Sequence, residues 1–501
     1  MKATTLLALV VCALAAAPRL PQPAYEEPLR PRVHFTPPRN FMNDPNGLVF
    51  YKGEYHLFYQ HNPFGATWGH MSWGHAVSSD LLHWQNLPVA LPEENGVMIF
   101  SGSAAVDWHN SSGLCAPGAD PSCLIAVYTG HGHGRQTQNL AYSNDRGRTW
   151  TKYSGNPVID LGLENFRDPK VFWHEPTRRW VLVTVLSDQH KVRLFGSEDL
   201  RTWKALSDFG PAGATGGVWE CPDLFPLPVD GDPTDVRWVL DVDINPGAPQ
   251  GGSGGQYFVG RFDGTTFVNE NSPGPTLWAD AGKDFYATIS FSDIPEADGR
   301  RIWIGWISNW QYANQEPTEI WRGAQSIPRV LGLRRGPEGI WLVQSPVAEL
   351  ETLRTGGTVT VPQSRSEVLP PSADIQLDIP RGQWREAGLR FSNSAGEEVL
   401  VGVTSSPEAF VDRRRSRRES WHAEYPARHA GEVRWIDGRI TMRVLFDRSV
   451  LEVFVNDGER VMTDRVYPVA PYDRVEWIGQ MPDGARARFW ELASVWTQAA
   501  R

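Results

Sequence analysis

The sequence contains little positive charge, few cysteines and, beyond its N-terminus, no long apolar run. Lys and Arg number 48 against 58 Asp and Glu, a net charge of −10, so the composition gives no reason to expect nucleic acid as a partner. After residue 14, no stretch is long and uncharged enough to cross a membrane as a helix. Helical periodicity is also scarce, which argues against a mostly helical fold. With 501 residues, the chain is long enough for two or three domains and a sizeable core.

The N-terminus has the pattern of an export signal. Lys2 precedes an apolar stretch over residues 6–14, and small residues follow it. We predict that residues 1–15 are a signal peptide with an uncertain cleavage point, and that the protein is secreted, to the extracellular space or the periplasm, without a membrane anchor. Cys12 leaves lipidation as an alternative, but Val11 is a poor match to the small residue that such processing prefers.

Three cysteines remain after this signal. Cys115 and Cys123 bracket a short loop rich in Pro, Gly and Asp, so a surface disulfide is plausible in an oxidising compartment. Cys221 has no obvious partner. Asn110 opens a glycosylation sequon, which matters only if the host glycosylates exported proteins.

Three segments place an acidic residue beside proline, arginine or cysteine at the edge of an apolar run. They are Asn43-Asp44-Pro45-Asn46-Gly47, Asn165-Phe166-Arg167-Asp168-Pro169-Lys170 and Trp219-Glu220-Cys221-Pro222-Asp223. The simplest interpretation of the first alone is a reverse turn between two extended segments. Three carboxylates could also meet in one pocket, and glycoside hydrolysis needs two there. One protonates the leaving oxygen, and the other attacks the anomeric carbon or activates water.

With several further segments, these three resemble the glycoside hydrolase family 32 enzymes: invertases, inulinases, levanases and other β-fructosidases. The similarity spans roughly residues 32 to 330 and continues more weakly to the C-terminus. Two positions depart from the family pattern. Phe41 stands where the family usually has Trp just before the Asn43–Gly47 motif, and His61 stands where another aromatic residue is common. The further segments, in family order, are Trp68–Ala76, Phe100–Ser103, Tyr128–Gly130, Asp284–Ala287, Ile304–Ala313 and the weaker Val453–Gly458.

The resemblance implies a role for each of the three acids. Asp44 corresponds to the nucleophile, Asp168 to the stabiliser of the transition state and Glu220 to the acid/base. In a retaining mechanism the nucleophile and the acid/base lie only about 5 to 5.5 Å apart. Because such proximity makes the second ionisation costly, we expect Glu220 to hold a proton near neutral pH while Asp44 is ionised. Arg167 could hold one of these carboxylates ionised and donate to the sugar.

Substrate-binding residues are chosen by their fit to a sugar. Amides and hydroxyls pair with sugar hydroxyls, and an indole offers a flat apolar face to the C–H side of the ring. No metal or other cofactor is expected, because His131 and His133, near His75, have no carboxylate or cysteine at ligand spacing; a solvated loop is the better interpretation. The predicted binding residues are Asn43, Gln60, Trp68, Phe100, Ser101, Arg167 and Trp310.

Short aromatic and β-branched runs alternate with turn residues, so we predict an all-β protein. An Asp precedes an aromatic residue at Asp80, Asp145, Asp199 and Asp263, a repeat typical of propeller blades. The repeat alone leaves four to six blades open, and the resemblance implies a five-bladed β-propeller over residues 32–335.

The sequence changes character after the propeller. Residues 336–357 are predicted to form a linker with a short helix at Val347–Leu353, and residues 358–499 a C-terminal β-sandwich. The basic run Arg413–Arg418 is interpreted as a charged loop of the sandwich, with a site for an acidic surface as the alternative.

The resulting prediction is an exported, retaining exo-β-fructosidase acting on terminal fructose of inulin, levan or sucrose. The segments Gly251–Gly260 and Trp306–Ala313 look most like the inulinase and levanase branch of the family. An invertase acting mainly on sucrose, a fructosyltransferase and a fructan-binding protein without activity remain alternatives; the complete acidic triad argues against the last. Linkage preference and oligomeric state are not predictable from the sequence.

Overall fold

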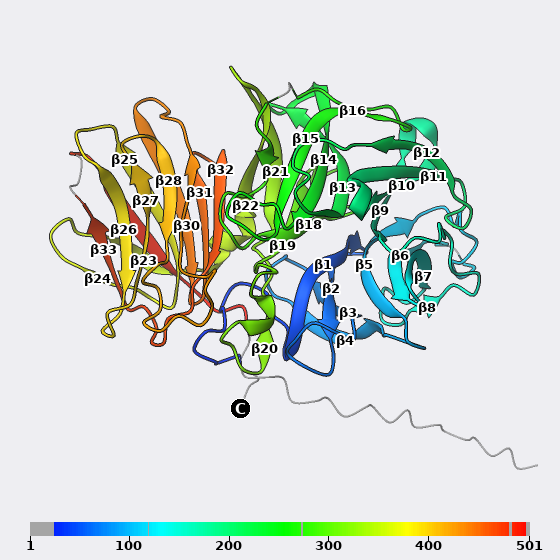
Figure 1. Ribbon diagram of the computed structural model, residues 1–501, viewed down its shortest axis with the longest axis horizontal. Helices are drawn as coiled ribbons and strands as arrows, with labels where there is room; N and C mark the ends of the chain where they lie inside the picture. The colour runs from blue at the N-terminus through cyan, green and yellow to red at the C-terminus, as the bar shows by residue number, and fades with distance from the viewer. Residues whose placement is uncertain (1–24, 119, 272–273, 480–482, 497–501) are drawn as a thin grey trace, which may run out of the picture.

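The computed structural model describes residues 25–118, 120–271, 274–479 and 483–496, nearly all of them in β-strands and their connections (Figure 1). The predicted signal peptide lies outside the described residues. Within them, no helix is long and apolar enough to cross a bilayer. Because strands make up nearly all of the regular secondary structure of these residues, the all-β prediction is confirmed. The helical turns are η1 (Glu175–Thr177), η2 (Ser187–Gln189), η3 (Ala313–Gln315) and η4 (Ala348–Leu353). η4 lies at the predicted short helix of the linker 336–357, but residues 339–346 of that linker form a strand paired with residues 329–336, because the apolar run of residues 340–343 favours a strand.

The N-terminal part consists of sheets whose strands mostly follow one another along the chain and pair antiparallel; β20 is an exception, because it pairs parallel with β1. The first contains β1 (Asn40–Tyr51), β2 (Glu54–Asn62), β3 (Ser72–Ser78), β4 (Gln85–Leu91) and β20 (Trp321–Arg322). The second contains β5 (Met98–Asp107), β6 (Cys123–Gly132), β7 (Arg135–Ser143) and β8 (Thr151–Lys152). The third contains β9 (Phe166–His174), β10 (Arg179–Leu186), β11 (Lys191–Ser197) and β12 (Lys204–Phe209).

A larger sheet follows, in which one parallel pair, Val229 with Leu333, joins two antiparallel sets of strands. The first set is β13 (Val218–Val229), β14 (Asp232–Asn245), β15 (Gly254–Phe262), β16 (Phe267–Asn269) and β17 (Leu277–Trp278). The second set is β18 (Tyr286–Ser290), β19 (Arg301–Trp306), β21 (Arg329–Gly336) and β22 (Gly339–Pro346).

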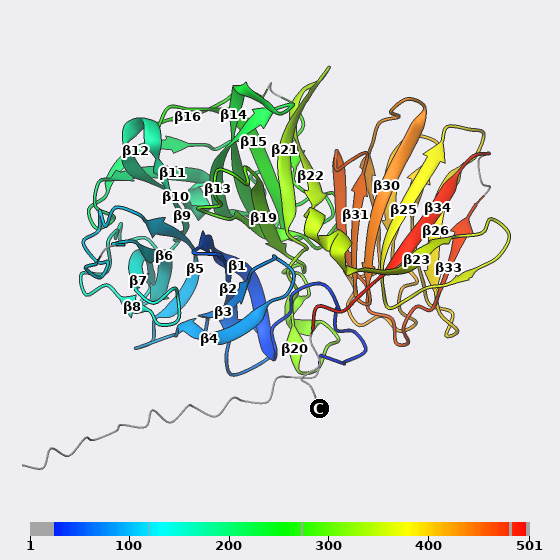
Figure 2. The same ribbon diagram turned by 180° about the vertical axis from the view of Figure 1, so that it is seen from behind.

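The innermost strands close a ring. β1 contacts β5, β5 contacts β9, β9 contacts β13, β13 contacts β18, and β18 returns to β1. Both views place these strands around the centre of the N-terminal part (Figures 1 and 2). This ring supports the predicted five-bladed propeller, although the blade count itself stays a prediction.

The Asp-led repeat has a structural counterpart. Asp80, Asp145, Asp199 and Asp263 lie in the connections β3–β4, β7–β8, β11–β12 and β15–β16. Each carboxylate accepts a hydrogen bond from a backbone N–H two to four residues later, at 2.7 to 3.0 Å. Asp caps these turns because its short side chain can bond the backbone just ahead of it. The repeat therefore marks the turns before β4, β8, β12 and β16, which are Asp-led as the sequence predicted.

The C-terminal part is a β-sandwich of two six-stranded sheets, as predicted. Alternate side chains of both sheets meet in one core that includes Ile375, Leu389 and Val444. One sheet contains β23 (Arg354–Thr360), β34 (Arg486–Leu492), β25 (Ser372–Pro380), β30 (Arg439–Asp447), β31 (Val450–Val455) and β32 (Arg460–Arg465). The other contains β24 (Glu367–Val368), β33 (Arg474–Ile478), β26 (Glu386–Ser392), β27 (Glu398–Thr404), β28 (Glu408–Asp412) and β29 (Arg428–Glu432).

The two parts share an extensive seam. Leu445 and Phe454 of the sandwich belong to the same apolar cluster as Leu57 and Ile302 of the propeller. Buried charges accompany this cluster: Arg329 contacts Glu452 at 2.7 Å and Asp280 at 3.2 Å. His34 bonds Asp447 and Glu452, each at 2.9 Å. These pairs compensate one another, which is the condition under which charges are tolerated inside a protein.

The two ends of the described chain meet at this seam. Tyr25 stacks on Trp496 with ring centroids 4.0 Å apart, and the Trp496 indole N–H donates to the carbonyl of Pro31. Val495 N–H donates to the carbonyl of Arg32 at 2.9 Å. The blue N-terminal and red C-terminal segments accordingly run together in both views (Figures 1 and 2).

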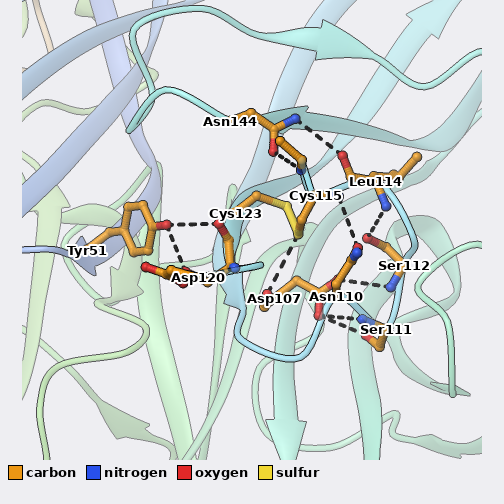
Figure 3. The surroundings of a disulfide bond; sticks show 12 residues. Tyr51, Asp107, Asn110, Ser111, Ser112, Leu114, Cys115, Asp120, Cys123 and Asn144 are labelled. Atoms are coloured by element: carbon orange, nitrogen blue, oxygen red, sulfur yellow. Dashed lines mark hydrogen bonds between the residues drawn. A yellow bond between two sulfur atoms is a disulfide. The ribbon is translucent and has the colours of Figure 1, made fainter. Parts of the chain in front are cut away.

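Cys115 and Cys123 form the expected disulfide, after β5 and at the start of β6 (Figure 3). The segment that leads from β5 to Cys115 is held by local hydrogen bonds. Asp107 accepts from the backbone of Ser111 and Ser112, and the Asn110 side chain accepts from the N–H of Cys115 at 3.0 Å. Cys221 is a free thiol.

The basic run differs from its prediction as a charged loop. Arg413 is completely buried in the seam, whereas Arg414 and Arg415 have exposed side chains paired with Asp412 and Glu398. The composition of the run did not distinguish these positions, because burial of Arg413 depends on acidic partners in the propeller, above all Asp284.

Candidate active site

Each of the three predicted acids lies at an interruption in the pairing of an inner strand. Register is lost at residues 42–45 of β1, 167–170 of β9 and 220–223 of β13. Two residues there have a left-handed backbone, Asp168 with φ 62° and Cys221 with φ 47°. Such bulges re-aim side chains out of the regular alternation. Asp44 is therefore inside β1 and not in a turn between strands, which corrects the simplest interpretation of its motif; a bulge accommodates Pro45 and Gly47 where a regular ladder would not.

Asp44 and Asp168 converge on one sulfur atom. The Sγ of Cys221 lies 3.6 Å from Asp44 Oδ2 and 3.7 Å from Asp168 Oδ2. Asp44 also accepts from the Ser101 hydroxyl at 2.5 Å and from the Asn43 amide at 2.9 Å. The backbone N–H of Cys221 donates to Asp168 Oδ2 at 3.0 Å. Two carboxylates from different strands are thus fixed side by side.

Glu220 joins this pair through Arg167. The guanidinium Nε donates to Glu220 Oε1 at 3.1 Å and lies 3.9 Å from Asp168 Oδ2. The hydroxyl of Tyr286, from β18, donates to the other oxygen of Glu220. The carboxyl group of Glu220 is therefore held between a cation and a phenol.

Burial raises two of the carboxyl pKa values. For Asp44, burial raises the pKa to about 6, the charge of Glu220 adds to this, and the donors Ser101 and Asn43 oppose it. For Asp168, burial raises the pKa to about 7, against the opposing charge of Arg167. Neighbouring carboxyl groups that share a site cannot all ionise together near neutral pH, and their protons belong to the group as a whole. Burial thus raises the pKa of both aspartates, and a proton held by Glu220 stays a prediction.

Aromatic side chains line the approach to these acids. Phe41, Trp306 and Trp310 pack together, with Trp306 and Trp310 centroids 4.8 Å apart, in one cluster with Cys221 and Tyr286. Phe100 belongs to the same cluster; the Trp68 ring meets its edge with ring centroids 5.9 Å apart, and 40% of Trp68 is exposed. The site is thus a polar, acidic floor with apolar walls, which is the composition of a sugar-binding pocket.

Comparison with known proteins identifies the family. The family model "Glycosyl hydrolases family 32 N-terminal domain" matches residues 34–346, and "Glycosyl hydrolases family 32 C terminal" matches residues 349–497. The chain belongs to glycoside hydrolase family 32. It is a glycoside hydrolase, a β-fructosidase.

The relatives of this family 32 chain include enzymes with named substrates. A levanase of Bacillus subtilis is 48% identical over 461 residues, which cover 89% of this chain and 67% of the levanase. An extracellular exo-inulinase of Aspergillus niger is 37% identical, over 99% of this chain and 100% of its own length. The crystal structure of exo-inulinase from Aspergillus awamori superimposes with a TM-score of 0.88 at 36% identity, covering 94% of this chain and 100% of that one.

The predicted binding residues of this family 32 site fall into three groups. Asn43, Ser101 and Arg167 contact Asp44 or Glu220 directly. Trp68, Phe100 and Trp310 form the walls. Gln60 is buried, and its amide donates to the carbonyl of Ile99 at 3.0 Å; it therefore supports the strand that carries Ser101. Their contacts with a sugar stay predictions.

The two departures from the family pattern lie next to each other. His61 Nδ1 bonds the carbonyl of Phe41 at 2.9 Å, and Phe41 packs 6.3 Å from Trp310. These residues therefore shape the wall and do not contact the acids.

One histidine differs from its prediction as part of a solvated loop. His131 lies at the end of β6 and stacks on Phe100, with ring centroids 4.5 Å apart. His133 lies in the exposed turn after β6, and the ring of His75 is buried against Phe58. Across the described ranges, no three His, Cys, Asp or Glu side chains form a group that could hold a metal ion.

Sequence reasoning missed Tyr286 and Cys221 as site residues. Both lie in recognised family segments, Asp284–Ala287 and the segment of Glu220. Their contacts with Glu220, Asp44 and Asp168 arise between strands far apart in the chain, so no local pattern revealed them.

Proposed function

We propose that this β-fructosidase is exo-acting and retaining, and that it releases terminal β-D-fructofuranosyl units from inulin, levan and sucrose. The observation that carries the proposal is the convergence of Asp44 and Asp168 on Cys221, with Glu220 joined to them through Arg167. The relatives named levanase and exo-inulinase support fructans as substrates.

In the first step, ionised Asp44 attacks C2 of the fructosyl unit while Glu220 gives its proton to the glycosidic oxygen. The bond between C2 and that oxygen breaks, the shortened sugar leaves, and a fructosyl ester forms on Asp44. Ser101 and Asn43 hold the attacking carboxylate by hydrogen bonds of 2.5 and 2.9 Å. A carboxylate fixed in this way loses little orientational freedom on reaction.

In the second step, Glu220 takes a proton from water, and the water oxygen attacks C2. Asp44 leaves as a carboxylate, and the two inversions together retain the β-configuration. Asp168 stabilises the positive charge that develops on the ring in both steps. Its carboxylate is fixed for that purpose by the Cys221 N–H at 3.0 Å.

The relatives named exo-inulinase and the narrow space beside the acids support the exo mode. The cavity that Ser101, Asp168, Cys221 and Ala287 line beside the acids has a volume of about 20 Å³. Such a volume holds about one water molecule, so a fructan chain cannot thread between the inner strands at this point. The sequence signal at residues 1–15 and the extracellular relatives support secretion of the enzyme.

Early products of inulin, levan and sucrose, measured side by side, test this function. We expect fructose from the first time point without intermediate oligosaccharides, and β-fructose as the first anomer in proton NMR spectra. Chromatograms dominated by fructo-oligosaccharides would contradict the exo mode, and initial α-fructose would contradict the double displacement.

A further inference from the structure

A buried arginine of the sandwich reaches into the catalytic part of the molecule. Arg413 follows β28 and is 0% exposed. Its Nε donates to the carbonyl of Tyr425 at 2.8 Å, and its Nη1 to the carbonyl of Arg465 at 2.9 Å and to the carboxylate of Asp284. Its Nη2 donates to the hydroxyl oxygen of Tyr312 at 2.7 Å. The guanidinium thus joins both parts of the chain.

The two propeller residues that Arg413 contacts each adjoin a part of the active site. Asp284 precedes Tyr286 by two positions, and the Tyr286 hydroxyl donates to Glu220. Tyr312 follows Trp310 by two positions. The Tyr312 hydroxyl also donates to Asp284. This bond links the segment of Tyr286 to the segment of Trp310.

The backbone around these residues is tied together as well. The Asn309 amide donates to the carbonyl of Lys283 at 2.9 Å and of Gly251 at 3.1 Å. The N–H of Trp310 donates to the Ser253 hydroxyl at 3.2 Å. The segment that carries Trp310 is therefore bonded to Lys283, the residue before Asp284. Displacement of either segment would displace the other.

The charges in this network depend on each other. Burial alone would raise the pKa of Asp284, but the Arg413 guanidinium and the Arg465 N–H hold it below its ordinary value. Removing one partner of a buried pair leaves the other charge without compensation. Arg413 also lies over the Tyr425 ring, 4.4 Å from its centroid, so its own position is fixed by packing.

We propose that Arg413, supplied by the β-sandwich, is a positioning residue of the active site. It fixes Asp284 and Tyr312, and through them it holds Tyr286 against Glu220 and the Trp310 indole against the bound sugar. This inference rests on the proposed function for the roles of Glu220 and Trp310. The sandwich is then a working part of the catalytic site as well as a support for the propeller.

The sharpest variant is Tyr312→Phe, which removes one hydroxyl and leaves Arg413 and Asp284 in place. Its matched control is Tyr51→Phe. Tyr51 is the last residue of β1, is 2% exposed, and donates its hydroxyl to the carbonyl of Ser122 at 3.0 Å. Both changes remove one buried, hydrogen-bonded hydroxyl from the same catalytic part of the chain.

We expect Tyr312→Phe to raise KM for sucrose and inulin several-fold and to lower kcat/KM about tenfold or more. Loss of a hydrogen bond to a charged group changes an equilibrium constant by about that factor. Tyr51→Phe should keep both constants within about twofold of wild type, with a comparable loss of Tm. A merely structural role of Tyr312 would lower Tm without raising KM.

Arg413→Lys provides the second measurement. Lysine keeps the positive charge near Asp284 but replaces the planar fork with one ammonium group, which cannot reach all four acceptors. We expect KM to rise in the same direction as for Tyr312→Phe. Wild-type KM and kcat in Tyr312→Phe would overturn the proposal. Absence of hydrolysis of every β-fructoside by the wild-type enzyme would instead contradict the proposed function.

Discussion

Asp44 is held by neutral donors, whereas Glu220 faces a guanidinium. The hydroxyl of Ser101 and the amide of Asn43 orient Asp44, but they do not compensate its charge as a cation would. Burial therefore raises the pKa of Asp44 to about 6. A carboxylate in this state is a better nucleophile than one paired with arginine, and the folded protein bears the free-energy cost of ionising it.

The first prediction concerns the free-energy cost of ionising Asp44 in the folded protein. The pKa of Asp44 in the folded protein lies above its ordinary value of 3.8, so ionisation destabilises the folded state, and the loss of stability develops as pH rises toward about 6. Asp44→Asn should therefore raise the free energy of unfolding at pH 8 by up to roughly 3 kcal/mol, and the gain should vanish toward pH 4. Urea denaturation at the two pH values measures it.

The same variant should lose several orders of magnitude in kcat, since an amide cannot form the fructosyl ester. Asp232→Asn is the control, because Asp232 is exposed and its backbone and side-chain hydrogen bonds with Thr234 lower its pKa. No stability gain is expected from it. A gain for Asp44→Asn that was equal at pH 4 and pH 8 would contradict the role of ionisation.

At this scale the sequence predicted the acids and Arg167 beside them, but not Tyr286 or Cys221. The motifs of Asp44, Asp168 and Glu220 are local, so they are visible in one strand each. The contact of Tyr286 with Glu220 joins residues 66 positions apart and required the ring of strands.

At the scale of elements, the interruptions of the inner strands recur. β5 loses register between Ile99 and Gly102, around Ser101, and β18 between Tyr286 and Ile289. The sequence predicted the strands and the Asp-led turns, because these depend on alternation and on one side chain bonding its own backbone. It did not predict the bulges, since a bulge exists only relative to a partner strand.

A second prediction belongs to the connection between β5 and β6. The disulfide joins cysteines 8 positions apart, and a loop of this size stabilises the fold by roughly 2–3 kcal/mol through the entropy of the unfolded chain. The double variant Cys115→Ser, Cys123→Ser should lower Tm by a few degrees, as measured by calorimetry without reductant.

Activity should survive this change. The loop follows the end of β5 at Asp107, whereas Ser101 lies in the first half of that strand. We expect kcat/KM on sucrose within about twofold of wild type. A large loss of activity in protein that remains folded would show that this loop supports the site.

At the scale of the whole molecule, the seam couples the propeller to the sandwich. The sequence predicted both parts, because each has its own alternation of apolar residues. It did not predict the seam, where His34, near one end of the chain, meets Asp447 and Glu452, near the other. Such pairs have no signature until the two folded parts are brought together.

The third prediction concerns the pH dependence of the seam. Burial alone would lower the pKa of His34, but Asp447 and Glu452 raise it to about 9. The stabilisation is therefore complete below pH 6.5 and is lost as pH rises through about 9. His34→Gln should lower the free energy of unfolding at pH 6 by up to roughly 3 kcal/mol, and the difference from wild type should shrink above pH 9.

The control is His83→Gln, because the exposed His83 pairs with Asp80 on the surface. Its effect should stay within about 0.5 kcal/mol. Urea denaturation at pH 6, 8 and 10 measures both variants. A constant difference for His34→Gln across this range would mean that the histidine acts by packing and not by charge.

The meeting of the two chain ends sets an order of events during synthesis. Pro31 and Trp496, which share a hydrogen bond, are 465 positions apart. The first segment of the chain leaves the ribosome early and must wait for the last strand before it can take its place. Loop closure over such a distance is slow compared with the local pairing of hairpins. The propeller strands can pair while translation continues, but the seam closes only when nearly the whole chain is available.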